Sequence, residues 1–159
     1  MNQLKLNSHH FNTSYNFKFA ETQKEFLLLK NLRIEVFVKE QSVPIDEEID
    51  KIDFYAHHAI AIHQKLVIAT GRVFRKQNQI AIIGRMAVMS KYRREKLGTN
   101  ILNLLETKAI GIGCVEVQLH AQTHARNFYE SNEYVAYGKE FKEAGIQHIK
   151  MKKNLLNYK

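Results

Sequence analysis

The sequence predicts one α/β or α+β domain. Its 159 residues, 45% of them hydrophobic, are enough for one core and too few for two ordinary domains. Strand-like and helical patterns follow one another in the order strand, helices, three strands, helix, strand, helix and two strands. Internal repeats, low-complexity tracts and linkers are absent from the sequence. We therefore expect a single core.

The first elements come before the only proline. Residues 1–14 are polar and without periodicity, which indicates an N-terminal tail, and a first strand is expected near residues 15–20. Apolar side chains crowd a helical surface over residues 21–41, although the β-branched run "RIEVFV" predicts a break or a second short helix. Pro44 opposes any further continuation of that helix.

Three strand-like runs follow. Residues 57–62 and 66–74 are separated by "HQK", which predicts a hairpin. Residues 80–88 form a longer run that Gly84 interrupts. A glycine inside a strand often marks a bulge or a close backbone approach, so we expect one of these at Gly84.

The last elements begin with a helix over residues 97–112, whose apolar residues recur on one face before "GIG" ends it. "CVEVQLH", residues 114–120, alternates as a strand does, and a short helix is expected at about 124–131. "YVAYG" and "IQHIKMK" are the two final strands. The lone Cys114 fits a reducing compartment and a buried packing role.

Charge is unevenly distributed over the chain. The net charge of +8 is compatible with nucleic acid, acidic lipid or a phosphorylated ligand as partner. However, acidic residues concentrate in "DEEIDKID", residues 46–53 (the acidic segment), and basic residues in "KYRREK", residues 91–96 (the basic turn). Apolar runs are much shorter than the ~20 residues that cross a bilayer, and no secretory leader pattern is visible. We expect a cytoplasmic protein without a membrane partner.

The basic turn lies where a strand gives way to a helix. A helix N-terminus offers free backbone N–H groups and positive dipole charge, which suit an anion. Cations at this end oppose the dipole by ~0.3–1 kcal/mol each, so a bound phosphate explains the turn better than a solvated loop does. The Walker and G-x-G-x-x-G nucleotide loops are absent.

"VMSKYRREKLGTNILNLLE" resembles motif A of the GNAT superfamily of N-acetyltransferases, whose (R/Q)-x-x-G-x-(G/A) loop holds the pyrophosphate of acetyl-CoA. Arg93 matches its first position and Gly98 its last, whereas Lys96 stands where the family has glycine. Further blocks, "LRIEVFVKEQSVPIDEEID", "FYAHHAIAI", "IGRMAV", "VQLHAQTHARNFYESNEYVAYGKEF" and "EAGIQHIKM", resemble the ElaA-like subgroup in order. The resemblance spans about residues 16–153.

The resemblance implies a GNAT-like domain over residues 15–159. It implies a mixed, mostly antiparallel sheet of about six to seven strands, flanked by about four helices, with splayed strands that form an acyl-CoA cleft. It also implies acetyl transfer from acetyl-CoA to a primary amine by direct attack in a ternary complex. The lone cysteine is not placed as a nucleophile, so no covalent intermediate is required.

The resemblance further implies site residues. Tyr129 would be the general acid for the CoA sulfur and Glu48 the base. Cofactor-binding residues would be Met86, Ala87, Val88, Arg93, Arg94, Glu95, Lys96, Leu97, Gly98, Thr99, Gln122 and Asn127. Substrate-binding residues would be Glu40, Gln41, Glu47 and His58.

Several alternatives stay open from the residues alone. The carboxylates of the acidic segment also fit a solvated loop, a histidine of the His57 and His58 pair also fits the core, and Gln122 and Asn127 also fit helix capping. Phe128 is expected inward, with Tyr129 toward the cleft. Lys96 costs ~1–2 kcal/mol if its backbone is left-handed, and otherwise points outward and adds a cation.

Two other functions compete with catalysis. A GNAT fold that only binds acyl-CoA is one, and a basic nucleic-acid-binding module with steep salt dependence is the other. The acidic segment argues against nucleic acid as a partner. No H-E-x-x-H or paired cysteine motif predicts a metal. The amine acceptor and the oligomeric state, including a homodimer, are undetermined at this stage.

Overall fold

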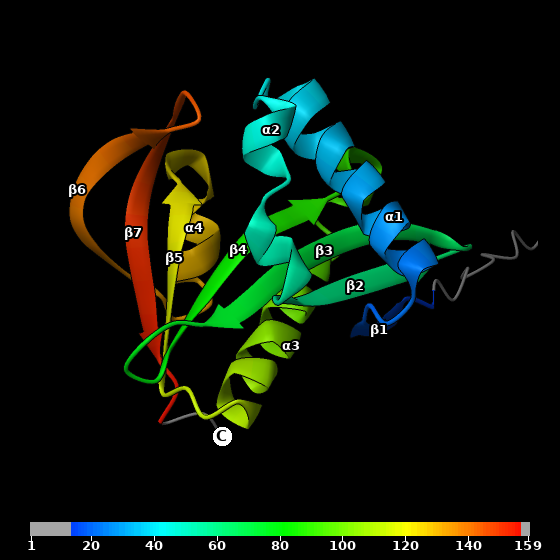
Figure 1. The fold of residues 1–159 in the computed structure, drawn as a ribbon. Helices are drawn as coiled ribbons and strands as arrows, with labels where there is room; N and C mark the ends of the chain where they lie inside the picture. Colours follow the sequence, from blue (N-terminus) through cyan, green and yellow to red (C-terminus); the bar gives the residue numbers. More distant parts are fainter. Residues whose placement is uncertain (1–13, 157–159) are drawn as a thin grey trace, which may run out of the picture.

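A seven-stranded sheet forms the centre of the molecule (Figure 1). The computed structural model describes residues 14–156, so the predicted tail of residues 1–14 lies almost wholly outside the described residues. The strand order is β1-β2-β3-β4-β5-β7-β6, and every neighbouring pair is antiparallel except β4 with β5. The strands are β1 (Asn16–Phe19), β2 (His57–His63), β3 (Leu66–Arg75), β4 (Ile80–Val88), β5 (Glu116–Gln122), β6 (Val135–Glu143) and β7 (Ile146–Asn154). The predicted mixed, mostly antiparallel sheet is confirmed.

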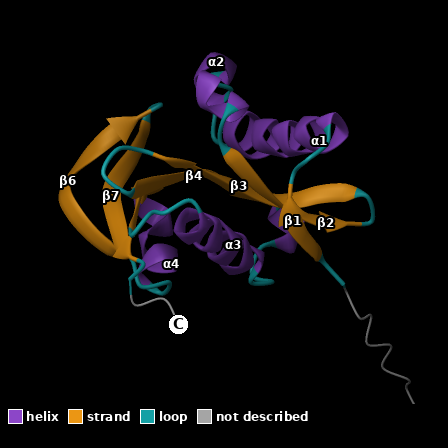
Figure 2. Cartoon of the chain, turned by 60° about the horizontal axis from the view of Figure 1, so that its bottom comes forward, coloured by secondary structure: helices purple, strands orange, loops and turns teal. Residues whose placement is uncertain are grey.

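Helices cover both faces of this sheet (Figure 2). They are α1 (Gln23–Arg33), α2 (Ile45–Glu48), α3 (Leu97–Gly111) and α4 (Arg126–Glu130). α1 and α2 lie on one face, and α3 and α4 on the other. The long helix α3 buries Leu97, Ile101, Leu102, Leu105 and Ala109 against the sheet. This apolar periodicity is what the sequence predicted for the helix.

α1 begins with a capping box, in which Glu25 N–H donates to Thr22 Oγ1 at 3.2 Å and Thr22 N–H donates to Glu25 Oε2 at 3.0 Å. After Arg33 the chain continues as a π-helical segment, Ile34–Glu40 (η1). The expected break in the helix is therefore present as a wider turn. Pro44 then precedes α2.

A bulge distorts β4 at the centre of the sheet. The pairing of β3 with β4 shifts register between Thr70 and Arg72, and Arg85, next to Gly84, has φ 55°. Opposite the bulge, a Cβ on Gly71 would lie 2.5 Å from Met86 Sδ and 2.8 Å from Leu105 Cδ1. Gly71 thus allows the side chains of α3 to pack closely on β3, beside the bulged strand.

β4 and β5 separate soon after they begin (Figure 1). They pair over only three residues, Ile80–Ile82 with Glu116–Gln118, whereas β5 pairs with β7 along its whole length. Residues 83–88 of β4 therefore have no strand partner on the β5 side. This divergence opens the sheet between its two halves.

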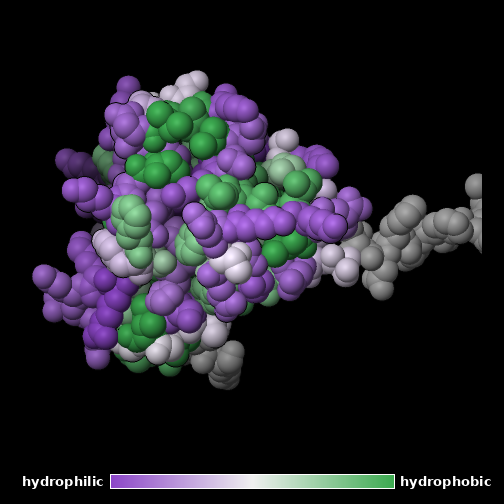
Figure 3. All heavy atoms as spheres, turned by 45° about the vertical axis from the view of Figure 1, so that its right-hand side comes forward, coloured by the Kyte–Doolittle hydropathy of each residue, from purple (hydrophilic) through white to green (hydrophobic). Residues whose placement is uncertain are grey.

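Exposed hydrophobic side chains are scattered over the surface. The face in Figure 3 shows hydrophobic patches interrupted by hydrophilic residues. Cys114 is buried, as expected. Within residues 14–156, every helix is too short or too polar to cross a bilayer.

Candidate functional site

A pocket of about 1090 Å³ occupies the opening between β4 and β5. Gly98 and Tyr129 line it from the α3 and α4 side, whereas Gln41 and Glu47 line it from the α2 side. Because these helices cover opposite faces, the pocket connects the two faces of the sheet. Such a passage lets two ligands meet from opposite sides.

The N-terminus of α3 faces this pocket without a cap of its own. Lys96, the residue before α3, has φ 57° and ψ 13°, and no side chain caps the helix. The first helical bond runs from Asn100 N–H to Lys96 O at 3.1 Å, so the preceding N–H groups are left as donors. A Cβ on Gly98 would lie 3.2 Å from the Phe128 ring, which places this terminus at the wall of the pocket. Of the two alternatives for Lys96, a left-handed backbone or an unstrained one, the structure therefore has the left-handed backbone.

The side chains of the basic turn are mostly exposed. Arg93 donates from Nε to Val88 O at 3.0 Å and from Nη2 to Glu40 Oε2 at 2.7 Å. Glu95 accepts a hydrogen bond from the Tyr15 hydroxyl, which raises the pKa of Tyr15 to about 12. Arg94 and Lys96 make no ion pair with any residue from 14 to 156. Two cations therefore remain beside the open helix end.

The free edge of β4 adds backbone donors. Met89 N–H donates to Ile68 O at 2.9 Å on the β3 side. In an antiparallel ladder successive N–H groups alternate in direction, so the N–H of Val88 is directed toward β5. β5 has already diverged there, and Met86, Ala87 and Val88 line the pocket.

Tyr129 lies on the wall of the pocket from α4. It is 7% exposed, and burial raises the pKa of its hydroxyl. The hydroxyl has no hydrogen-bond partner among the described residues. Phe128, 5.0 Å away between ring centroids, lines the same pocket and is less buried than Tyr129. Tyr129 therefore lines the cleft as expected, whereas Phe128, expected only in the core, lines the cleft as well.

Asp46 and Glu47 of the acidic segment are exposed, as in a solvated loop, but Glu48 and Asp53 are buried. Together with Asp50 they belong to an arginine–carboxylate network. Its members are Arg33, Glu48, Asp50, Asp53, Arg72 and Arg85. Arg33 donates to Glu48 Oε1 at 2.5 Å and to Asp53 Oδ1 at 2.7 Å. Arg72 donates to Asp53 Oδ1 at 2.7 Å and to Asp50 Oδ2 at 2.8 Å. Three guanidiniums thus balance three carboxylates.

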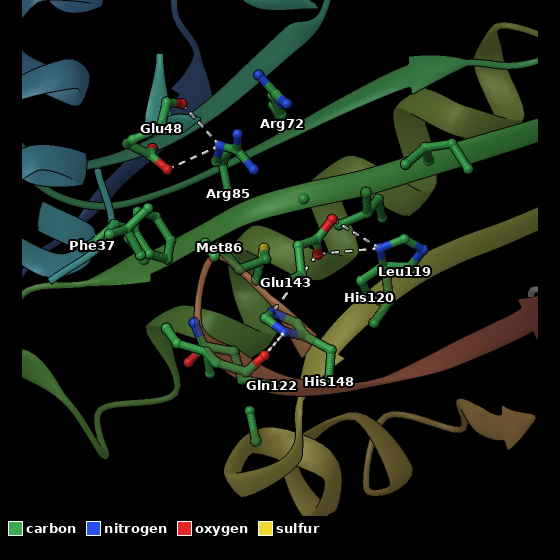
Figure 4. A pocket seen from close by; sticks show the side chains of 18 of the residues that line it. Phe37, Glu48, Arg72, Arg85, Met86, Leu119, His120, Gln122, Glu143 and His148 are labelled. Carbon is green, nitrogen blue, oxygen red and sulfur yellow. Dashed lines mark hydrogen bonds and ion pairs between the residues drawn. The ribbon is translucent and has the colours of Figure 1, made fainter. Parts of the chain in front are cut away.

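Glu48, the expected base, is only 2% exposed. Burial raises its pKa, against the opposing charges of Arg33 and Arg85. Its Oε1 accepts a hydrogen bond from Arg33 Nε. Its Oε2 lies 3.0 Å from Arg85 Nε (Figure 4). A proton on Glu48 would leave buried guanidiniums without their counter-charge. The geometry therefore favours a structural role for Glu48.

The other predicted residues divide between the pocket and its surroundings. His58 is buried away from the pocket lining, with Nε2 3.1 Å from Asp53 O, and burial lowers its pKa. The Glu40 carboxylate accepts a hydrogen bond from Arg93, and Glu40 does not line the pocket. Asn127 is exposed on α4, outside the lining. Their expected ligand contacts are not supported by these positions.

Gln41 and Gln122 line the pocket and hydrogen-bond each other. Gln122 Nε2 donates to Gln41 Oε1 at 2.8 Å, and Gln41 Nε2 donates back at 3.2 Å. This amide pair joins η1 to the end of β5 across the opening. Glu47 also lines the pocket, and its carboxylate has no ion pair within the described chain.

Sequence reasoning missed a cluster on the opposite wall of the pocket. Glu143 of β6 lies between His120 of β5 and His148 of β7 (Figure 4). Its Oε2 is 3.2 Å from His120 Nδ1 and 3.9 Å from His148 Nε2. The alternation of "VQLHAQ" places Gln118, His120 and Gln122 on one face of β5, which was the available signal. Within residues 14–156 no group of side chains is arranged to hold a metal ion.

Comparison with known families gives one match over most of the chain. A family model described as an acetyltransferase (GNAT) domain matches residues 20–155. The chain is 36% identical over 124 residues to Bacillus subtilis YjcF, described as an uncharacterized N-acetyltransferase. That match covers 77% of this chain and 88% of YjcF.

Solved structures show the same architecture. Escherichia coli ElaA is 31% identical over 133 residues, covering 80% of this chain and 86% of ElaA. Its crystal structure superposes with a TM-score of 0.77 over 89% of this chain and 99% of that one, at 27% identity. An acyl-CoA N-acyltransferase from Pseudomonas aeruginosa gives a TM-score of 0.77 at 29% identity, covering 87% of this chain and 97% of that one.

Proposed function

Because the chain belongs to the GNAT family of acetyltransferases, we propose that it transfers an acetyl group from acetyl-CoA to a primary amine. The amine attacks the thioester directly while both ligands are bound. The pocket that connects the two faces of the sheet supports this arrangement, because cofactor and acceptor enter from opposite sides. The name of the P. aeruginosa structure, an acyl-CoA N-acyltransferase, supports the cofactor class.

The diphosphate of CoA is placed at the N-terminus of α3. Backbone N–H groups of Leu97, Gly98 and Thr99 are the donors, and the helix dipole favours the negative charge. Arg94 and Lys96, which make no ion pair within residues 14–156, supply cations next to them, and Arg93 adds a third if its guanidinium leaves Glu40 for the phosphate. Glu95, held by Tyr15, contributes through its backbone.

The acyl-pantetheine arm follows the free edge of β4. The N–H of Val88 is aimed into the opening, where it donates to the thioester oxygen or to a pantetheine amide. A preorganised backbone donor of this kind contributes ~2.7–4 kcal/mol to transition-state stability when it binds the oxyanion. Gln122 offers an amide to the same arm once its pair with Gln41 opens.

The acceptor amine enters from the α2 side as an ammonium ion. Glu47 and Asp46 line that end of the pocket, and neither carboxylate is ion-paired within residues 14–156. They would hold a cationic group by charge. Tyr129, whose hydroxyl lacks a partner among the described residues, would protonate the departing sulfur.

The divergence of β4 from β5 directly beside an uncapped helix N-terminus carries this proposal. Calorimetric titration with CoA and acetyl-CoA should give saturable heat, and thiol release should require an amine. Binding without release for any amine would support a non-catalytic acyl-CoA protein. An absence of heat with both ligands would overturn the proposal.

Tyr129→Phe tests the general acid. Loss of a positioned acid should reduce turnover by roughly 10²–10⁴-fold and leave CoA affinity nearly unchanged. Tyr55→Phe, at an exposed tyrosine, is the matched control and should keep full turnover. Equal losses of affinity and turnover in Tyr129→Phe would assign the residue to binding.

A further inference from the structure

A base for the acceptor amine is required by the chemistry, and Glu48 is not free to serve. A lysine-like amine is neutral in only about one molecule in 2500 at pH 7, since its pKa is ~10.4. Both carboxylate oxygens of Glu48 face guanidinium nitrogens. The base must therefore come from another side chain on the acceptor end of the pocket.

His148 lies on that end. It pairs across the ladder with Gln122, so both side chains are on the same face of the sheet, away from α3. Its side chain is 9% exposed, and it lines the pocket. Phe141 stacks on the imidazole with 5.9 Å between centroids, which restricts the ring.

The tautomer of His148 follows from one hydrogen bond. Nδ1 lies 2.8 Å from the carbonyl oxygen of Ile146. A carbonyl oxygen only accepts, so Nδ1 carries the hydrogen, and the lone pair of the neutral ring is on Nε2. Nε2 is the atom that lies 3.9 Å from Glu143 Oε2.

The charged groups around His148 suit proton uptake. Glu143 of β6 faces Nε2 and also contacts His120 of β5, so it stabilises the imidazolium after protonation. Lys150 of β7 follows on the same face and opposes that effect. Asp46 and Glu47 line the same pocket from α2 and hold the ammonium.

We propose that Nε2 of His148 is the general base of the transfer, with Glu143 as its positioning residue; this inference rests on the proposed function. The ammonium gives one proton to Nε2, and the freed lone pair attacks the thioester carbon. As the C–S bond breaks, the Tyr129 hydroxyl gives its proton to the departing sulfur. The nitrogen of the tetrahedral intermediate still carries one proton more than the amide product, and this proton passes to the Tyr129 oxygen. The imidazolium then releases its proton to solvent through the open end of the pocket.

His148→Asn is the sharpest variant, because the Asn amide nitrogen can still donate to Ile146 O while the basic nitrogen is lost. With an alkylamine acceptor, kcat/KM at pH 7 should fall by roughly 10²–10⁴-fold. The ascending limb of the pH–rate profile, which reports deprotonation of the general base, should disappear. His57→Asn, at an exposed histidine on β2, should keep both.

A second acceptor separates catalysis from structure. A weakly basic amine, already neutral at pH 7, needs no initial deprotonation, so His148→Asn should lose much less activity with it. CoA affinity and Tm should stay near wild type, and Glu143→Gln should give a smaller loss with the alkylamine.

Equal losses with both acceptors, or an unchanged pH profile in an active variant, would overturn the assignment of His148 as the base and leave the proposed function standing. A wild type that releases no thiol with any amine would overturn the proposed function as well. A variant that loses its fold is replaced by His148→Gln, for which the same two-acceptor comparison decides.

Discussion

The arginine–carboxylate network and the basic turn differ in what neutralises their charge. In the network, Arg33, Arg72 and Arg85 meet Glu48, Asp50 and Asp53, and all of these side chains are buried except Arg85 and Asp50, which are 27% and 29% exposed. In the basic turn, Arg94 and Lys96 are exposed and unpaired within the described chain, next to a helix end that is also positive.

This difference separates a structural charge cluster from a binding one. Buried charges persist only when they are paired, so the network joins α1, the acidic segment and two strands into one unit. Exposed like charges at a helix N-terminus are unfavourable until an anion arrives. Function is therefore expected where charge is left uncompensated.

The largest expected effect is the loss of Arg33. Arg33→Met should destabilise the protein by about 3–5 kcal/mol, because it leaves Glu48 and Asp53 buried without their partner. Urea unfolding measures the change. Arg126→Met, in an exposed pair with Glu130, should change stability by at most ~0.5 kcal/mol. A small effect at Arg33 would mean that the network is not a stabilising unit.

Acid should weaken the same network. Burial alone would raise the pKa of Asp53, but the hydrogen bonds and charges of Arg33 and Arg72 lower it to about 2. A lowered pKa contributes stability that is complete above the ordinary value of 3.8 and is lost as pH falls through about 2. Asp53→Asn should be less stable at pH 5 and lose less between pH 4 and pH 2. Parallel losses in both proteins would contradict this assignment.

Lys96→Gly should act in the opposite direction in the basic turn. Relief of a left-handed lysine backbone should add about 1 kcal/mol to the free energy of unfolding. Lys91→Gly, at a position without positive φ, should add nothing. Lys96→Asn removes the charge but tolerates the left-handed backbone, so CoA titration of both variants separates charge from strain. A decrease in stability for Lys96→Gly would contradict the strain.

The smallest expected effect belongs to Arg94. Arg94→Gln should weaken CoA binding about fivefold, since an exposed charged contact contributes about 1 kcal/mol. Added salt should reduce the difference. Thermal unfolding should be unchanged, because Arg94 has no ion pair within residues 14–156. An equally large loss at high salt would show that charge is not the cause.

Much of the fold was predictable because it depends on local pattern. β4 matches the predicted residues 80–88, the "HQK" turn joins β2 to β3, and α3 begins at Leu97 as expected. The bulge lies at Arg85, directly after the glycine that indicated it. Each of these signals depends on a few neighbouring residues, so it can be read directly from the sequence.

The candidate site was predictable only in part. The basic turn, β4 and Tyr129 line or adjoin one pocket, yet His58, Glu40 and Asn127 do not line it. The burial of Glu48 depends on Arg33 and Arg85, which lie 15 and 37 residues away along the chain. His148 was missed because its tautomer depends on the turn at Ile146 and its neighbours on two other strands.

The sequence by itself determined the order and type of the elements, the family and the positive charge of the basic turn, since hydrophobic period and residue identity act over a few residues. Only the tertiary structure decided which charges are neutralised and which face the pocket. The physical reason is that the burial of a charge, and therefore its pKa and its availability, is set by partners from distant strands and helices.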